Sequence, residues 1–206
     1  FSPEDTWITK GAPAARRKLL DITLCQTDAR YLSALANYER ARRQRNEALA
    51  SWTPDEEADR LVDAWTDRLV EYGSRIVAAR LSFLPVFGEA ASRYHGLVVD
   101  EDALEVGYRC SLGDEVSAAA PDELSGGVAE RAVADVFERA LGELASDERR
   151  RGFTLVGPHR DDLEVRLGGR SLRTFGSQGQ HRTAAIALKL AQAAILGEEE
   201  RKVVVL

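Results

Sequence analysis

Apolar residues recur along the first half of the chain at the spacing of packed α-helices. Between residues 31 and 52, positions at alternating steps of four and three form an apolar seam that two arginines interrupt: Tyr31, Leu35, Tyr38, Arg42, Arg45, Leu49 and Trp52. Residues 58–83 keep the same rhythm without polar interruption. A sustained period of about 3.5 residues is typical of two helices that pack along a common seam. The two segments therefore predict an antiparallel helical hairpin.

The residues between these two segments predict a tight connection. Thr53 is a good N-cap, Pro54 suits the first helical position, and Glu56 completes a capping box. The same periodicity would also suit two core helices of an ordinary bundle. A protruding arm and a compact bundle are both compatible with the pattern.

The remaining segments predict further helices and a few strands. Helices are expected over 14–24, from Pro85 to Gly96 with a kink, over 129–151 and over 183–196. Strands are expected over 104–112 and 153–156, in a hairpin over 163–175, and over 203–206. The order places a long apolar helix directly before a final strand.

Composition is that of a globular chain with one or two domains. The chain has 206 residues, of which 44% are hydrophobic, and a net charge of −6. No apolar run reaches the roughly 20 residues of a membrane helix, and no basic-then-apolar leader begins the sequence. We therefore expect no membrane association and a cytoplasmic location. Cys25, Cys110 and the three histidines lack metal-ligand or paired spacing, which predicts no disulfide and no bound metal.

Basic residues concentrate in one part of this acidic chain. From Lys10 to Arg45 there are nine basic residues and three acids, a local charge of +6. Such a block indicates a face that meets phosphate groups. Arg16, Arg17, Lys18, Arg42 and Arg45 are the candidates for DNA contact. A solvated helix face, an interdomain contact or, for Arg42 and Arg45, an interhelical ion pair would explain the same residues.

A second candidate site is the segment Gly176–Arg182, which precedes the long apolar helix. Ser177 is a good N-cap, and Gly179 allows a bulky anion to approach the backbone. Gln180 can donate from its side-chain amide. The first amides of a helix have no intrahelical partners and carry partial positive charge, so this segment predicts a phosphate seat.

Five motifs carry a resemblance to a known family. They are Phe1–Asp5, Gly11-x-Pro13-x-x-Arg16-Arg17-x-x-Leu20-Asp21, Tyr38-x-x-Ala41-x-x-x-Arg45-Asn46, Gly157–Leu163 and Gly176–Gln180. In this order they resemble the RecF family of bacterial recombination mediators, related to the structural-maintenance-of-chromosomes ATPases. The Leu124–Gly127 segment matches the general ABC signature more closely in sequence than Gly176–Gln180 does, but it lies too far from the final strand. We expect it to be a loop that starts a helix.

The resemblance implies an α/β, helix-rich fold. It would be the part of an ABC/SMC-type ATPase head that carries the signature motif, with an inserted antiparallel helical hairpin. The implied division is 1–24 as the edge of an ATPase lobe with a basic helix, 25–96 as the hairpin arm, and 97–206 as the signature lobe ending in the Walker B strand.

The resemblance also implies a function and its partners. It implies an ATP-dependent mediator that dimerises on ATP, binds double-stranded DNA and single/double-strand junctions, and helps load recombinase in DNA repair and replication restart. ATP and Mg²⁺ would be the cofactors, held mainly by parts of the protein outside this segment, and RecR and RecO the partners. Ser177, Gln178, Gly179 and Gln180 would contact the nucleotide held by the other subunit. His159, Arg160, Asp161 and Asp162 would form an interface or switch.

The segment lacks the residues that hydrolysis needs. No Gly-x-x-x-x-Gly-Lys-Ser/Thr loop is present, and the acids that would hold Mg²⁺ are expected beyond Leu206. We therefore expect a segment of a longer protein with no catalytic residue of its own. The resemblance implies weak DNA-stimulated ATPase activity in a full-length dimer. A non-catalytic helical-hairpin adaptor with an ATPase-like fold is the alternative.

Overall fold

The computed structural model describes residues 6–99, 102–113, 116 and 127–204. The chain forms two compact units, each built from separate stretches of sequence. The helical unit comprises the described residues of Ala29–Ser82 and Cys110–Arg160. The sheet unit comprises those of Phe1–Asp28, Phe83–Arg109 and Asp161–Leu206.

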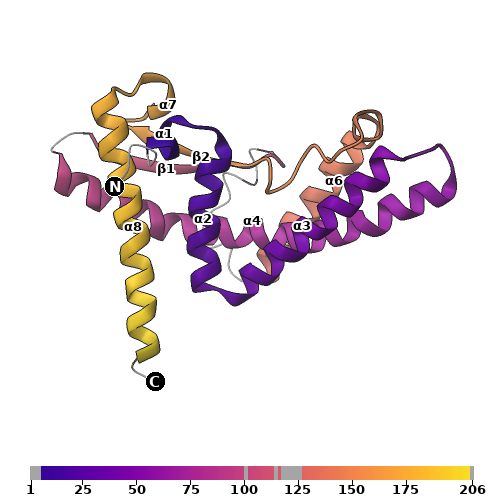
Figure 1. Ribbon diagram of the computed structural model, residues 1–206, viewed down its shortest axis with the longest axis horizontal. Helices are drawn as coiled ribbons and strands as arrows, with labels where there is room; N and C mark the ends of the chain where they lie inside the picture. Colours follow the sequence, from indigo (N-terminus) through magenta and orange to yellow (C-terminus); the bar gives the residue numbers. More distant parts are fainter. Residues whose placement is uncertain (1–5, 100–101, 114–115, 117–126, 205–206) are drawn as a thin grey trace. The chain divides into compact units, whose positions relative to one another are not determined.

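Helices dominate both units, as the apolar periodicity predicts. In chain order the elements are α1 (Trp7–Lys10), α2 (Pro13–Thr27), α3 (Ala29–Ala50), α4 (Glu56–Val98), β1 (Leu104–Arg109), α6 (Gly127–Arg151), β2 (Asp162–Leu167), β3 (Arg170–Ser171), α7 (Leu172–Phe175) and α8 (Gln178–Val204) (Figure 1).

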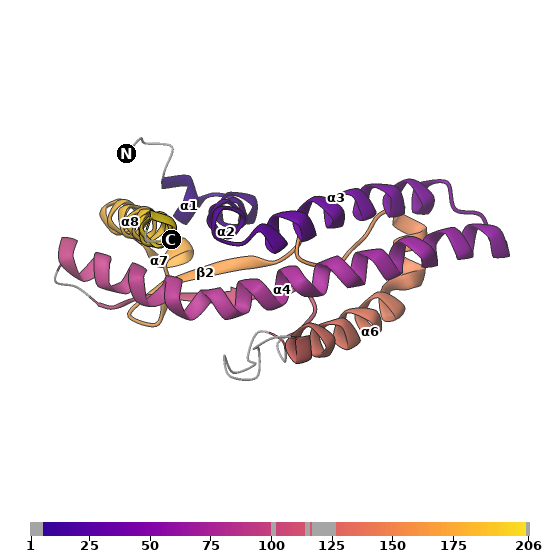
Figure 2. The same ribbon diagram turned by 90° about the horizontal axis from the view of Figure 1, so that it is seen from below.

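The helical unit contains the expected hairpin. Helices α3 and α4 run antiparallel, and Ala48, Leu49 and Val62 form a buried cluster near their connection, with Trp52 packed against it. Helix α6 lies alongside them (Figure 2). Gly73 lies so close to Phe137 of α6 that an added Cβ would be 2.5 Å from its ring. The hairpin therefore packs against a third helix, α6, within this unit.

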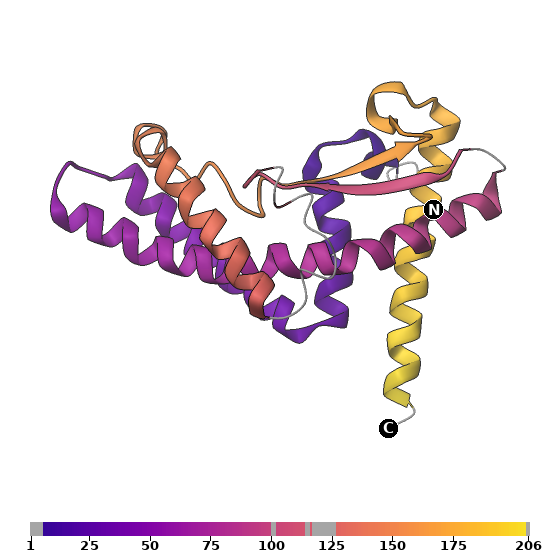
Figure 3. The same ribbon diagram turned by 180° about the vertical axis from the view of Figure 1, so that it is seen from behind.

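The sheet unit has a three-stranded antiparallel sheet in the order β1-β2-β3 (Figure 3). Strand β1 pairs with β2 along its whole length, from Leu104 opposite Leu167 to Arg109 opposite Asp162. Helix α2 packs against both β2 and α8. At the α2–α8 contact, buried Gln192 donates to the Thr23 hydroxyl at 2.9 Å.

Several elements differ from the sequence expectation. Helix α4 continues through Pro85, and therefore no separate helix begins there. The Pro85 ring is exposed. Residues 153–156 form no strand. The second arm of the expected hairpin has only two strand residues before α7 begins.

The final strand is also not found among the described residues. Helix α8 continues through Val204, and residues 205–206 lie outside the described part of the chain. The charged run 198–202 contains good helix formers and no proline, which explains the continuation. The loop at 124–126 is likewise outside the described residues, and α6 begins at Gly127.

Candidate functional site

The segment Gly176–Gln180, here called the signature loop, joins α7 to α8. The Ser177 hydroxyl accepts a hydrogen bond from the Gln180 backbone N–H at 3.2 Å, and Gln180 Oε1 accepts one from the Ser177 N–H at 3.0 Å. This reciprocal pair is a capping box of the Ser-x-x-Gln type. Ser177 is therefore the N-cap of α8, and the Gln180 amide oxygen is held by the backbone of the loop.

The signature loop faces solvent. The side chains of Ser177 and Gln178 are exposed, and a Cβ added to Gly179 would meet nothing closer than Ser177 Oγ at 3.8 Å. The N–H groups of Gln178 and Gly179 have no hydrogen-bond partner among the described residues. Two free amides beside an open glycine at the positive end of a 27-residue helix fit an anionic group such as a nucleotide phosphate.

Buried groups hold the loop from behind. Gly176 is packed so tightly that an added Cβ would lie 2.5 Å from the Leu172 carbonyl oxygen and 3.1 Å from His181 Nε2. The imidazole of His181 is only 3% exposed. The His181 carbonyl oxygen accepts a hydrogen bond from the Thr9 hydroxyl at 3.3 Å. The sequence placed His181 inside the candidate segment but gave it no role, because no local pattern shows its contacts with Thr9 of α1 and with Gly176.

The first two basic candidates have internal partners in the sheet unit. Arg16 is 3% exposed, and its Nε and Nη2 donate to the two Asp162 oxygens at 2.7 and 2.9 Å. Its Nη1 donates to the carbonyl oxygens of Ile8 and Gly11. Arg17 donates to the Asp161 carbonyl oxygen at 2.6 Å. Of Arg16, Arg17 and Lys18, only Lys18 is exposed.

The basic candidates of the helical unit also have partners. Arg45 is 3% exposed and binds Glu148, Thr66 and Thr154 at 2.7–3.0 Å. Arg42 pairs with Glu39 at 2.6 Å on the surface of the same helix. Burial removes Arg16 and Arg45 from any DNA-facing surface, because their hydrogen-bonding groups already have partners inside their own units.

Gly157 and Pro158 are buried in a corner of the helical unit, followed by the partly buried His159 and the exposed Arg160. Gly157 has φ of +122°, and an added Cβ would lie 2.6 Å from the Tyr38 hydroxyl and 2.7 Å from the Phe137 ring. Only glycine fits there. His159 Nδ1 is 2.6 Å from the Tyr38 hydroxyl, and Arg160 is exposed with its guanidinium 5.5 Å above the Phe153 ring.

Asp161 and Asp162 belong to the sheet unit and are buried there. The Tyr108 hydroxyl donates to Asp161 Oδ2, and Arg109 adds a contact of 3.3 Å to Asp162 beyond the Arg16 pair. The described residues contain no group of three or more potential metal ligands. Both carboxylates therefore have partners within this unit and help to hold its fold together.

Arg109 and Arg173 are two cations that sequence reasoning did not single out. They line a cavity of about 330 Å³ beside β2, whose other polar walls are Thr9, Arg16, Asp162, Glu164, Ser171 and Thr174. The two residues are 64 positions apart in the chain, which no local pattern could connect.

None of the described helices is long and apolar enough to cross a membrane.

Comparison with known proteins adds relatives over nearly the whole chain. The DNA replication and repair protein RecF of Salinibacter ruber is 43% identical over 201 residues, covering 93% of this chain and 45% of the relative. RecF of Symbiobacterium thermophilum is 39% identical, covering 97% and 50%. No protein-family model matches the chain.

Solved structures give the same result for the fold. Structures of the recombination mediator protein RecF with ATP and with ATPrS, in the RecFOR pathway, match with a TM-score of 0.85 and 31% identity. They cover 97% of this chain and 51% of the matched chain. The fold is therefore part of an ABC/SMC-type ATPase head. The chain belongs to the RecF family and spans about half the length of the curated relatives that it matches.

Proposed function

We propose that this chain provides the signature half of an ATP-driven dimerisation switch in a RecF-type recombination mediator. The observation that carries the proposal is the capped, exposed signature loop at the start of α8. The membership of the chain in the RecF family, with structures of RecF bound to ATP, supports a nucleotide as its ligand.

The signature loop would act on a nucleotide held by a second subunit. The N–H groups of Gln178 and Gly179 would donate to a terminal phosphate, and Ser177 would hold its hydroxyl beside that phosphate. A ligand that contacts both subunits stabilises the joined state by linkage. Bound Mg²⁺, held by other parts of the protein, would neutralise phosphate charge. Hydrolysis would then remove the ligand that holds the dimer together.

The dimer would act on DNA in repair and replication restart. The RecF relatives are DNA replication and repair proteins, and the matched structures are of a recombination mediator in the RecFOR pathway. We therefore propose double-stranded DNA and single/double-strand junctions as substrates, RecR and RecO as partners, and recombinase loading as the outcome in the cytoplasm. The DNA contacts would come from exposed cations, because Arg16 and Arg45 are buried.

The substitution Ser177→Arg tests the trans nucleotide contact in the intact protein. The new guanidinium would fill the phosphate seat, so we expect ATP-induced dimerisation to be lost while the single subunit still binds ATP with nearly unchanged affinity. Light scattering with and without ATP measures the oligomeric state, and a fluorescent ATP analogue measures binding to the monomer.

A matched control introduces the same cation elsewhere. Ala132 is exposed on α6 in the helical unit, so Ala132→Arg should dimerise like the unsubstituted protein. Loss of monomer affinity with dimerisation intact would contradict the assignment of the loop to a second subunit's nucleotide. An unsubstituted protein that stays monomeric with ATP would instead favour the non-catalytic adaptor.

A further inference from the structure

The imidazole of His181 lies in the first turn of α8, directly behind the signature loop. It is 3% exposed, and Nε2 lies 3.1 Å from the position that a Gly176 Cβ would take. Nδ1 is buried and has no hydrogen-bond partner among the described residues. A buried ring nitrogen without a partner costs stability, so its presence at this place calls for an explanation.

The backbone of His181 is tied to the same loop. Its N–H donates to the Ser177 carbonyl oxygen at 3.0 Å, and its carbonyl oxygen accepts the Thr9 hydroxyl at 3.3 Å. A displacement of the imidazole would therefore disturb the two backbone hydrogen bonds by which His181 binds Ser177 and Thr9 of α1. Ring and backbone of one residue support Gly176 and Ser177 together.

The charged side chain that acts on the imidazole is a cation, Lys10 on α1. Among the described residues, the adjoining elements also carry Arg173 on α7 and Arg182 on α8, and neither α1 nor α7 contains an acid. Arg16 on α2 is neutralised by Asp162. Burial, and secondly the charge of Lys10, lower the pKa of His181 below its ordinary value. Both causes disfavour the protonated ring, because a proton would place a cation in a desolvated position beside the charge of Lys10.

We propose that His181 is a positioning residue for the signature loop, and that the loop keeps its phosphate-binding geometry only while this imidazole is neutral and buried. The inference rests on the function proposed above for the loop. Protonation would drive the ring toward water, open the first turn of α8, and misplace the Gln178 and Gly179 amides.

The test follows two signals against pH between 5 and 8 in the intact protein. One is the nucleotide-dependent self-association constant with ATP, and the other is the hydrogen-exchange protection factor of the His181 N–H. We expect both to fall together, at the pH where the NMR titration of the His181 imidazole shows its midpoint below the ordinary histidine value. His181→Gln, which cannot gain a charge, should remove the pH dependence of both signals.

A second variant tests the electrostatics without touching the core. Lys10 is exposed, so Lys10→Gln should fold normally. Removing this cation makes the imidazolium less unfavourable, so the midpoint of both signals should move to higher pH. Lys18→Gln removes the same charge from an exposed site on α2 and should leave the midpoint in place.

The outcomes separate this inference from the function on which it rests. Absence of ATP-dependent association at every pH would remove the proposed function, whereas the exchange signal would still support the positioning role if it follows the imidazole titration. An unchanged pH profile in His181→Gln, or an imidazole midpoint at the ordinary value, would overturn the positioning role even if the dimer forms.

Discussion

Two buried guanidinium–carboxylate pairs connect distant stretches of sequence, one pair within each unit. Arg16 and Asp162 are 146 residues apart, and Arg45 and Glu148 are 103 apart. Each arginine has several hydrogen bonds, and each pair is almost fully buried. The cost of removing such charges from water is offset only when both partners are present, so loss of one partner is far worse than loss of both.

Asp162→Ala should therefore destabilise the sheet unit strongly. It leaves Arg16 as an uncompensated buried cation, and we expect a loss of about 3 kcal/mol in the free energy of unfolding, measured by urea denaturation. The double variant Arg16→Met/Asp162→Leu should recover most of that loss. Arg166→Ala, on the same strand but in an exposed pair with Glu164, should leave the denaturation midpoint unchanged. Equal losses for the single and double variants would contradict the charge argument.

Local signals at single residues were read correctly where the partner is near in sequence. Ser177 was predicted as an N-cap and its hydroxyl does cap α8, because the partner Gln180 is only three residues away. Arg16 looked like a phosphate-binding residue since the sequence cannot show a carboxylate 146 positions away. The buried place of His181 was invisible for the same reason.

At the scale of elements, the start of α4 shows how a cap was predicted two residues from its true position. Asp55 is the residue that caps α4, since its Oδ1 accepts the N–H groups of Glu57 and Ala58 at 3.0 and 2.9 Å. Thr53 donates its hydroxyl to Asp55 instead of capping the helix itself. Both residues are good caps, and which one acts depends on the path of the connecting chain.

The cap at Asp55 has a pH dependence of known sign. The hydrogen bond from Thr53 and those from the backbone lower the pKa of Asp55. The stabilisation of the folded state by the ionised Asp55 carboxylate is therefore fully present above the ordinary aspartate pKa. It is lost as the pH falls through the lowered pKa that Asp55 has in the folded state. Asp55→Ala should lower the Tm at pH 7, and the difference from the unsubstituted protein should shrink as the pH falls below the ordinary aspartate pKa. Asn also caps helices but does not titrate. The Tm of Asp55→Asn should therefore differ from that of the unsubstituted protein at pH 7, but the contribution of its cap should not be lost at low pH.

Long elements were predictable and short ones were not. The repeated apolar pattern predicted α3, α4 and α6, because many residues support each of these helices. Alternation over 171–175 was taken for a strand, yet α7 begins at Leu172 and buries that side chain against its unit. Five residues are too few to distinguish one turn of helix from a strand, so packing decides.

At the scale of the molecule, fewer of the nine basic residues between Lys10 and Arg45 are available for phosphate contact than the sequence suggests. Of its nine cations, Arg16 and Arg45 are buried, Arg17 donates to a backbone carbonyl and Arg42 is paired. Lys10, Lys18, Arg30, Arg40 and Arg43 are exposed. Arg40 and Arg43 lie together on α3 and have no partner among the described residues. They lie three positions apart, on one side of the helix. We therefore expect this surface of the helical unit to supply phosphate contacts in the proposed DNA complex.

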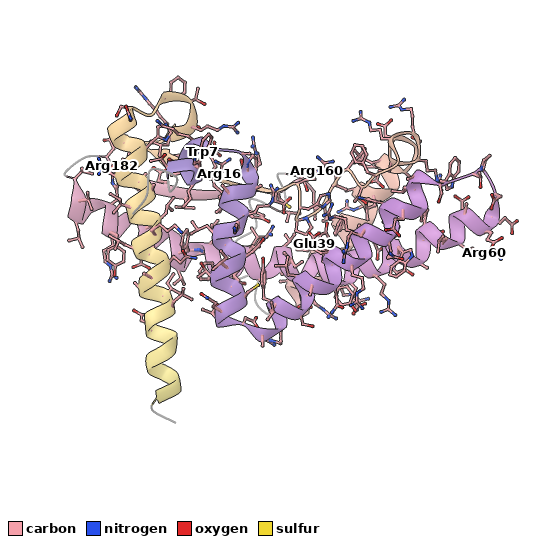
Figure 4. All side chains as sticks on the ribbon, in the orientation of Figure 1. Trp7, Arg16, Glu39, Arg60, Arg160 and Arg182 are labelled. Atoms are coloured by element: carbon pink, nitrogen blue, oxygen red, sulfur yellow. The ribbon has the colours of Figure 1, made fainter. Side chains whose placement is uncertain are left out.

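Arg40→Ala/Arg43→Ala should weaken DNA binding by the intact protein to a similar degree for unrelated sequences. Each lost phosphate contact should flatten the slope of log K against log salt by roughly 0.9, so the double variant should lose up to about 1.8. As a control, Arg60→Ala/Arg68→Ala removes the same charge from α4. Both of these arginines are paired with glutamates, and Arg60 lies near the connection between α3 and α4 (Figure 4). This control should change the slope little. Equal slope changes in the two double variants would mean that net charge, and not this surface of α3, determines DNA binding.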